Sequence, residues 1–335
     1  MPKPLFSHIR LLSAGRSTVL ATLTTLAACG GGSGDTSSSP TTVDAEKLQQ
    51  TTVSGFPHAV DIYKPVGATR AIVALHGGGG NKTAIAYQLG LNSTADSASN
   101  TTINWAWLQA HHVMLVLPQG QHIDGQEGAT TWTNYAMRSG QDDKAFLQAL
   151  AAQIRSDYGI DTITLMGHSM GGVMTNRMWC ESPSTFSSYV SLAGPASTTF
   201  NRPATPCQPG SAAKPYMGII GDSDEVMQTT GAWAAPSWTI NPAVVLASLP
   251  AWDNNTVIAE MLQQQTRTTL LCGQTLDTNT YSTSGNIDSW TSCGGRLVLK
   301  RVHSAEHGVA SINTQMNSSN PTQVMDTVAN FVEGL

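Results

Sequence analysis

The chain has 335 residues, of which 40% are apolar and only 12% are Asp, Glu, Lys or Arg. Its 17 basic and 22 acidic residues give a formal net charge of −5, and no basic cluster marks a surface for nucleic acid, so a nucleic-acid partner is not expected. No unbroken apolar run reaches about 18 residues, which excludes a polytopic membrane protein, and 8 Trp among periodic apolar runs exclude a wholly disordered chain.

Residues 1–28 have the layout of a secretory signal peptide. Lys3, Arg10 and Arg16 precede an apolar run from Val19 to Ala28. The run leads into Cys29 and Gly30, and this ending resembles the bacterial lipoprotein signal box, in which the cysteine becomes the lipidated N-terminus after cleavage. The resemblance implies lipidation of Cys29, and the alternative is ordinary signal cleavage with an incidental cysteine.

Residues 29–50 are expected to form a flexible tether, because Gly, Ser and Thr dominate the segment that follows Cys29. We therefore expect an exported protein, lipid-anchored to the bacterial cell envelope, first of all the outer membrane, or secreted. Contact with a membrane would be through the lipid anchor alone.

Residues 51–335 are predicted to form one α/β domain with a mostly parallel central sheet and helices on both faces, because short β-branched runs alternate with helical segments. The expected strands are Ala59 to Tyr63, Ala71 to Leu75, Val113 to Leu117, Thr162 to Met166, Tyr189 to Leu192, Tyr216 to Ile220 and Leu297 to Val302. The expected helices are Asp142 to Tyr158, Met170 to Cys180, Val257 to Gln265 and Gln323 to Val332. The span from Thr229 to Ser292 is interpreted as an insertion over one end of the sheet.

The sequence Gly167-His-Ser169-Met-Gly171 lies between a predicted strand and a predicted helix. A serine on so tight a turn needs glycine on both sides, since larger side chains would clash. The helix that follows directs N–H groups and the positive end of its dipole at a developing oxyanion. This context favours Ser169 as a nucleophile, and the alternative is a glycine-rich turn after a buried strand.

The sequence His76-Gly-Gly-Gly-Gly80 directly follows another buried strand and is similar to the H-G-G-G oxyanion loop. Backbone N–H groups reach an oxyanion only where no side chain intervenes, which consecutive glycines allow. The N–H groups of Gly78 and Met170 are the candidate oxyanion donors. Standing alone, four glycines could also be a flexible loop.

Chain order selects the partners of Ser169, because this arrangement places the acid and then the histidine after the serine. Only His303 and His307 follow Ser169, and we favour His307, which lies in the loop beyond the last predicted strand. For the acid, the loop after Ile220 offers three carboxylates, of which Asp224 is preferred to Asp222 and Glu225.

The candidate substrate contacts are Trp132, near the edge of the sheet where ligands bind in such folds, and His168 within the elbow motif. An aromatic platform of Trp233, Trp238 and Trp252 would suit a ferulic ring or a polyester chain. Hydrophobic packing is the alternative for each of these tryptophans.

If Cys29 is lipidated, four cysteines remain, an even number suited to two disulfides in an oxidising compartment. Three pairings are possible, and the most local one joins Cys180 to Cys207 and Cys272 to Cys293. Neither spacing has the form of a metal site, so no metal is expected.

Together these features resemble one family, the α/β-hydrolase family of extracellular poly(3-hydroxybutyrate) depolymerases and feruloyl esterases, from about Thr52 to the C-terminus. The similarity rests on the order of the oxyanion loop, the elbow, Trp132, the pair Asp142-Asp143, and the late acid and histidine. It implies an α/β-hydrolase catalytic domain over 51–335, a triad of Ser169, Asp224 and His307, and the same two local cysteine pairs.

The resemblance implies a serine carboxylic-ester hydrolase that works through an acyl-enzyme and needs no cofactor. Its partner would be an ester substrate: a small ester, a polyester or an ester linked to polysaccharide. Short-chain or hydroxyalkanoate esters are ranked first, and feruloyl or acetyl esters of plant polysaccharide second. A non-catalytic surface binding protein that retains the fold is the alternative of a different class.

Overall fold

A computed structural model describes residues 46–335, apart from 124–127, 135–137, 195–206, 225 and 227–255. The signal segment, Cys29 and most of the expected tether therefore lie outside the described residues. So do Glu225 and the three tryptophans of the expected aromatic platform, Trp233, Trp238 and Trp252.

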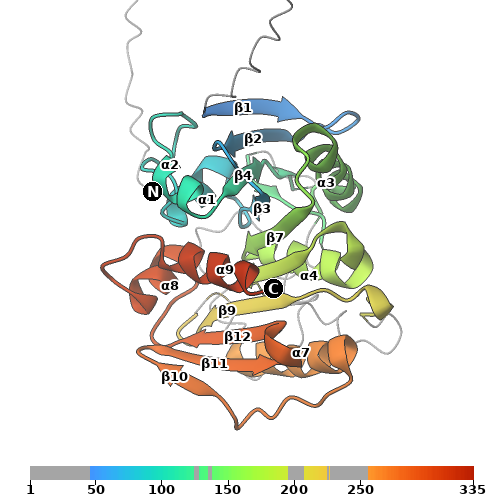
Figure 1. Ribbon diagram of the computed structural model, residues 1–335, viewed down its shortest axis with the longest axis vertical. Coiled ribbons are helices and arrows are strands. Elements are labelled where there is room, and N and C mark those ends of the chain that lie inside the picture. Colours follow the sequence, from blue (N-terminus) through green and yellow to red (C-terminus); the bar gives the residue numbers. More distant parts are fainter. Residues whose placement is uncertain (1–45, 124–127, 135–137, 195–206, 225, 227–255) are drawn as a thin grey trace, which may run out of the picture. The chain divides into compact units, whose positions relative to one another are not determined.

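A ten-stranded sheet runs through the described domain (Figure 1). Its strands, in spatial order, are β1 (Lys47–Thr52), β2 (Ala59–Lys64), β4 (Val113–Pro118), β3 (Arg70–Leu75), β7 (Thr162–His168), β8 (Ser188–Leu192), β9 (Tyr216–Gly221), β12 (Leu297–Val302), β11 (Ile287–Ser292) and β10 (Ser282–Ser284). The strands from β4 to β12 pair in parallel, whereas β1, β2, β11 and β10 pair antiparallel at the two edges. A separate short ribbon joins β5 (Gln121–His122) to β6 (Thr130–Thr131).

Helices cover both faces of the sheet. They are α1 (Lys82–Gln88), α2 (Trp105–Ala110), α3 (Asp143–Tyr158), α4 (Met170–Glu181), α7 (Thr256–Cys272), α8 (Val309–Met316) and α9 (Gln323–Glu333). Single 3₁₀ turns occur at Pro183–Thr185, Gly210–Ala212 and Cys293–Gly295.

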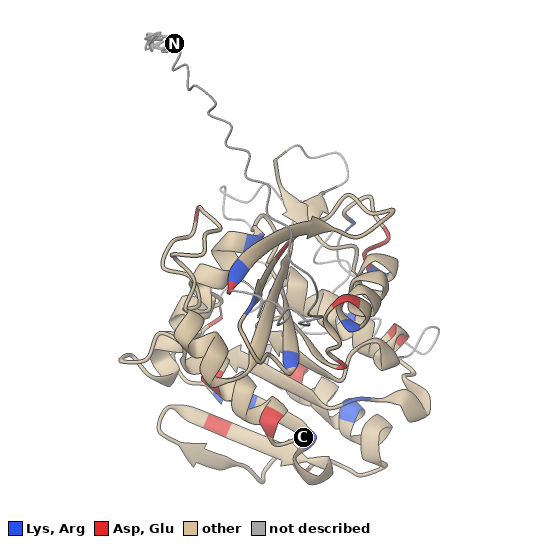
Figure 2. Cartoon of the chain, turned by 45° about the horizontal axis from the view of Figure 1, so that its top comes forward, with Lys and Arg blue, Asp and Glu red and all other residues tan. Residues whose placement is uncertain are grey.

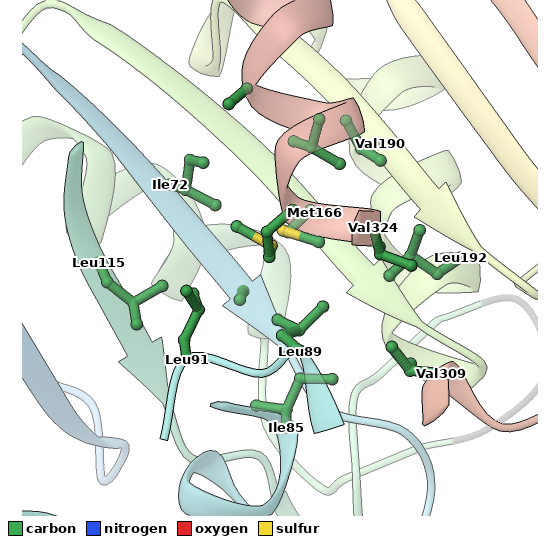
Figure 3. Close-up of a cluster of buried hydrophobic side chains, with 14 of the residues drawn as sticks. Ile72, Ile85, Leu89, Leu91, Leu115, Met166, Val190, Leu192, Val309 and Val324 are labelled. Atoms are coloured by element: carbon green, nitrogen blue, oxygen red, sulfur yellow. The ribbon is translucent and has the colours of Figure 1, made fainter. Parts of the chain in front are cut away.

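Each strand divides its side chains between two cores, because successive residues point to opposite faces. On β3, Val73 packs with α3 and α4, whereas Ile72 packs with α1, α2, α8 and α9. Figure 3 shows the second core, where Ile72, Met166 and Val190 of three neighbouring strands meet Val324 of α9. A sheet buried on both faces explains the uninterrupted apolar runs of the central strands.

All seven expected strands and all four expected helices are present, with ends that differ by at most two residues except for the helix expected at Val257 to Gln265, which continues to Cys272. The domain begins earlier than expected, because Lys47 to Gln50, assigned to the tether, pair with β2 as part of β1. The interpretation of Thr229 to Ser292 as an insertion also needs correction: its described part supplies α7 and two strands, β10 and β11, that extend the sheet. These edge strands are rich in Ser and Thr and lack the apolar runs of the central ones.

Two disulfides join the cysteines in the local pairing, Cys180 with Cys207 and Cys272 with Cys293. Acidic and basic residues are few and dispersed over the elements of the domain (Figure 2). Within the described ranges, none of the helices combines the length and apolarity required to cross a membrane.

Candidate active site

Ser169 occupies a strained turn between β7 and α4. Its φ of 54° and ψ of −119° lie in a region that side-chain-bearing residues rarely adopt. A Cβ on Gly167 would lie 2.3 Å from the carbonyl of Gly171, and one on Gly171 would lie 2.6 Å from the carbonyl oxygen of Leu75. Glycine is therefore required at both positions, and the turn raises the Ser169 side chain above the end of β7.

His307 and Asp224 form a hydrogen-bonded pair at the same end of the sheet. His307 Nδ1–H donates to Asp224 Oδ2 at 2.8 Å, and the Asp224 side chain is completely buried. The loops that carry them are also joined: Ser223 N–H donates to the carbonyl of Ala305 at 3.0 Å. A Cβ on Gly221 would lie 2.1 Å from that carbonyl oxygen, so only glycine allows the two loops to approach so closely.

The less favoured candidates, Asp222 and His303, pair with each other instead. His303 Nδ1 lies 2.8 Å from Asp222 Oδ2, and His303 Nε2 lies 3.0 Å from Asp288 Oδ2. Asp222 Oδ1 also accepts the N–H of Ser304 at 2.7 Å. None of these residues lines the cavity beside Ser169, and the pair instead links β11 to the ends of β9 and β12.

Ser169 and His307 line one cavity of about 130 Å³, together with residues of the glycine loop and of α1. His307 Nε2 is buried and has no hydrogen-bond partner among the described residues. With Nδ1 held by Asp224, this nitrogen is free to accept a proton from Ser169 Oγ. In ligand-free structures such catalytic hydrogen bonds are often longer than in the reacting complex.

The glycine loop presents Gly78 to the same cavity. The carbonyl of Gly77 accepts a hydrogen bond from His76 Nδ1–H at 2.7 Å and another from Gly80 N–H at 3.1 Å. Because the C=O and N–H of a trans peptide point in opposite directions, these bonds turn the Gly78 N–H the other way. That N–H has no acceptor among the described residues, as an oxyanion donor requires.

The second expected donor, Met170, begins α4, where the first N–H groups of a helix have no partner inside the helix. Asn134 Nδ2 donates to the Met170 carbonyl at 3.0 Å. The chain before Asn134 holds the glycine loop, since Gly79 N–H donates to the carbonyl of Thr130 at 2.7 Å. Residues 130–134 thus contact both segments that carry the candidate donors.

Trp132 lies elsewhere than expected. It is fully buried and does not line the cavity, and its Nε1–H donates to the carbonyl of His76 at 2.9 Å. Its indole therefore packs inside the domain and binds the main chain at the start of the glycine loop, which favours the packing alternative over the predicted substrate contact. His168 does line the cavity, but its Nε2–H donates to the carbonyl of His307 at 2.9 Å.

Two buried imidazoles stay uncharged beside the site. Burial lowers the pKa of His76 to about 4 and that of His168 to about 3. For His76, Nε2 accepts the N–H of Gly120 at 2.9 Å, so its single proton is on Nδ1 and points to Gly77. These histidines shape the loops around Ser169 and add no positive charge to the site.

Sequence reasoning gave no role to the buried pair His58 and Asp143. His58 Nε2 lies 2.6 Å from Asp143 Oδ1, and Asp143 Oδ2 accepts from Ser139 Oγ and from the N–H of Thr133. The His58 ring lies parallel to that of Trp132, with centroids 6.2 Å apart. In the sequence, the adjacent Asp142 and Asp143 were the sign that an acidic residue has a structural role here. Asp142 caps α3, and Asp143 anchors the loop that holds Trp132.

No family model and no curated protein matches the sequence. An acetyl xylan esterase from Aspergillus awamori shares 15% identity, with a TM-score of 0.52 over 85% of this chain and 98% of its own. TT1662 from Thermus thermophilus shares 12% identity, with a TM-score of 0.50 over 86% of this chain and 99% of its own.

An S-formylglutathione hydrolase from Staphylococcus aureus shares 9% identity, with a TM-score of 0.49 over 86% of this chain and 98% of its own. At 15% and 12% identity, the similarities to the acetyl xylan esterase and to TT1662 concern the fold alone. Together with the parallel sheet, its covering helices and the strand order, they show that the chain has the α/β-hydrolase fold.

Proposed function

We propose that this protein is a serine carboxylic-ester hydrolase that resembles polyhydroxybutyrate depolymerases and acts on short-chain or hydroxyalkanoate esters. The observation that carries the proposal is the convergence of Ser169, the His307–Asp224 pair and the free Gly78 N–H on one cavity. A nucleophile, a base oriented by a carboxylate, and oxyanion donors are the groups that acyl transfer requires.

The reaction would proceed in two halves. His307 Nε2 accepts the proton of Ser169 Oγ as Oγ attacks the ester carbonyl carbon, and the N–H groups of Gly78 and Met170 stabilise the oxyanion. The bond to the alcohol breaks, and the leaving oxygen takes the proton from His307. Water then attacks the acyl-enzyme in the same way, which releases the acid and returns the proton to Ser169.

The size of the cavity supports a short acyl group. At about 130 Å³ it is smaller than most sites for drug-sized ligands, and α1 forms one wall through Ala84, Ile85 and Gln88. This small volume also favours the second candidate, acetyl esters of polysaccharide, over feruloyl esters, whose aromatic ring needs more room.

Export and lipid anchoring through Cys29 are part of the proposal. They are supported by the N-terminal sequence and by two disulfides, which persist in oxidising compartments. Mass spectrometry of the membrane-extracted protein would test the anchor: the expected N-terminal residue is a lipidated Cys29, and an unmodified Cys29 would contradict it.

The activity is tested with p-nitrophenyl esters from acetate to octanoate, comparing the wild type with Ser169→Ala. We expect turnover of the shortest esters by the wild type and a loss of several orders of magnitude in the variant. A folded wild type no faster than the variant on every ester would overturn the proposal and favour a binding protein that retains the fold.

A further inference from the structure

His168 connects the nucleophile strand to the loop of the proposed base. It is the last residue of β7, next to Ser169, and its Nε2–H donates to the main-chain carbonyl of His307 at 2.9 Å. The two imidazole centroids are 5.0 Å apart. In the described part of the chain, this is the one hydrogen bond between residues 167–170 and residues 303–308.

The proton on this bond has a defined position. A carbonyl oxygen only accepts hydrogen bonds, so Nε2 of His168 carries the hydrogen. The ring is 8% exposed, and burial keeps its pKa well below the usual value, which leaves Nδ1 without a proton at neutral pH. Nδ1 faces the glycine loop, where a Cβ on Gly77 would lie 3.2 Å away.

His307 is therefore held at two points. Asp224 fixes its imidazole through Nδ1, and His168 fixes its main chain through the carbonyl oxygen. A ring restrained at both places has little freedom to turn Nε2 away from the cavity that it shares with Ser169. Because His168 and Ser169 are adjacent in the chain, the same turn places both the nucleophile and the restraint on the base.

We propose that His168 is a positioning residue that sets the main chain of His307 relative to Ser169, and that it is not a substrate contact. The proposal rests on the function proposed above. A neutral hydrogen-bond donor suits this place, because His307 becomes an imidazolium during the reaction and a second cation 5.0 Å away would oppose that charge.

The test uses the full chain with His168→Phe, which keeps the ring size and loses the donor, and His168→Gln, whose Nε2 can replace the lost N–H. Both are assayed on p-nitrophenyl acetate and butyrate. We expect His168→Phe to lower kcat about 10- to 100-fold on both esters with little change in KM, since a small displacement of a base has effects of that size. We expect His168→Gln to recover most of the loss.

Unchanged kcat in His168→Phe would overturn the proposal, as would a raised KM or an altered preference between the two esters in both variants, the signature of a substrate contact. If His168→Phe does not fold, as judged by circular dichroism, His168→Asn replaces it, because its shorter amide cannot reach the carbonyl and should lose kcat to the same extent. Absence of turnover by the wild type on every ester would instead overturn the proposed function, and this role of His168 with it.

Discussion

Two aspartate–histidine pairs lie close together in the sequence, and at the residue scale only one of them faces the cavity. Asp224 is buried and its partner His307 lines the cavity with Ser169, whereas Asp222 and His303 are partly exposed and bind Asp288 and the main chain. The two pairs consist of the same residue types and are carried by the same two loops, so each is a matched control for the other.

We expect Asp224→Asn to lower kcat by about three to four orders of magnitude, because an amide cannot stabilise the His307 imidazolium or hold Nδ1–H as a donor. Asp222→Asn should lower kcat less than about tenfold, since its partner does not reach the cavity. Steady-state kinetics on one short ester decides between the pairs. Equal losses, or a larger loss in Asp222→Asn, would assign the catalytic acid to the other aspartate.

The buried neutral imidazoles of His76 and His168 make stability depend on pH. Their pKa values in the folded protein, about 4 and about 3, lie below the value near 6.5 of an unfolded histidine. The unfolded chain therefore binds protons first as the pH falls, so stability is highest above about pH 6.5 and is lost toward pH 4. As the pH falls from 7 to 5, protonation of each of these two histidines in the unfolded chain should lower the free energy of unfolding by about 2 kcal/mol.

Urea unfolding followed by tryptophan fluorescence at the two pH values measures this loss. His168→Gln removes one of the two buried imidazoles. The free energy of unfolding of this variant should therefore fall between pH 7 and pH 5 by about 2 kcal/mol less than that of the wild type. An identical loss in the variant and the wild type would show that His168 is not a buried neutral imidazole.

Sequence alone predicted the residues whose chemistry requires a local pattern. The glycines around Ser169 and after His76 are needed for close backbone approach, and such needs are visible in a motif. The actual contacts of Trp132 and His168 were not predictable, because each bonds to the main chain of a segment far away in the sequence. The identity of a side chain does not reveal which distant main-chain carbonyl it will bind.

At the scale of elements, α1 limits the cavity on one side through Ala84 and Ile85. Ile85 also packs in the core, but Ala84 is half-buried and can accept a larger side chain. Ala84→Leu should narrow the cavity and lower kcat/KM for butyrate at least tenfold more than for acetate. The expected tenfold difference follows because one methylene group in a hydrophobic pocket changes the binding free energy by about 1–3 kcal/mol. An unchanged ratio between the two esters would place the acyl group elsewhere.

Helix α7 has a polar inner face. Arg267 is completely buried: its Nη1 donates to Glu260 at 2.9 Å, its Nη2 donates to Asn176 of α4 at 2.6 Å, and its guanidinium lies 3.8 Å from the centroid of the Tyr216 ring. Apolar periodicity is weak on such a helix, and the expected span of 257–265 therefore stops short of Cys272.

Arg267→Leu should lower the free energy of unfolding by roughly 3–5 kcal/mol, because it leaves the Glu260 carboxylate buried without its cation. The double variant Arg267→Leu with Glu260→Leu should recover much of this loss, since two apolar side chains leave no charge uncompensated. Urea denaturation measures both. A loss below about 1 kcal/mol in the single variant would show that the ion pair is not buried as described.

For the molecule as a whole, the sequence was most informative where one physical requirement, such as burial on both faces, applies to every residue of a segment. Strands buried on both faces must be apolar throughout, and parallel strands bring their carboxyl ends to one edge, so both the sheet and the location of the candidate site could be predicted. The antiparallel strands at the edges escape these demands: β10 is exposed, and the two buried residues of β11 are Asp288 and Trp290, only one of which is apolar.

The proposed function requires above all that Ser169 is a nucleophile activated by His307. A fluorophosphonate reacts with such a serine and leaves a stable covalent adduct, independently of which ester is the natural substrate. Incubation of the full chain with this reagent, followed by mass spectrometry of its peptides, locates the adduct. The expected result is one adduct on Ser169 that His307→Gln forms far more slowly, whereas no adduct in the folded wild type, or one on another residue, would contradict the claim.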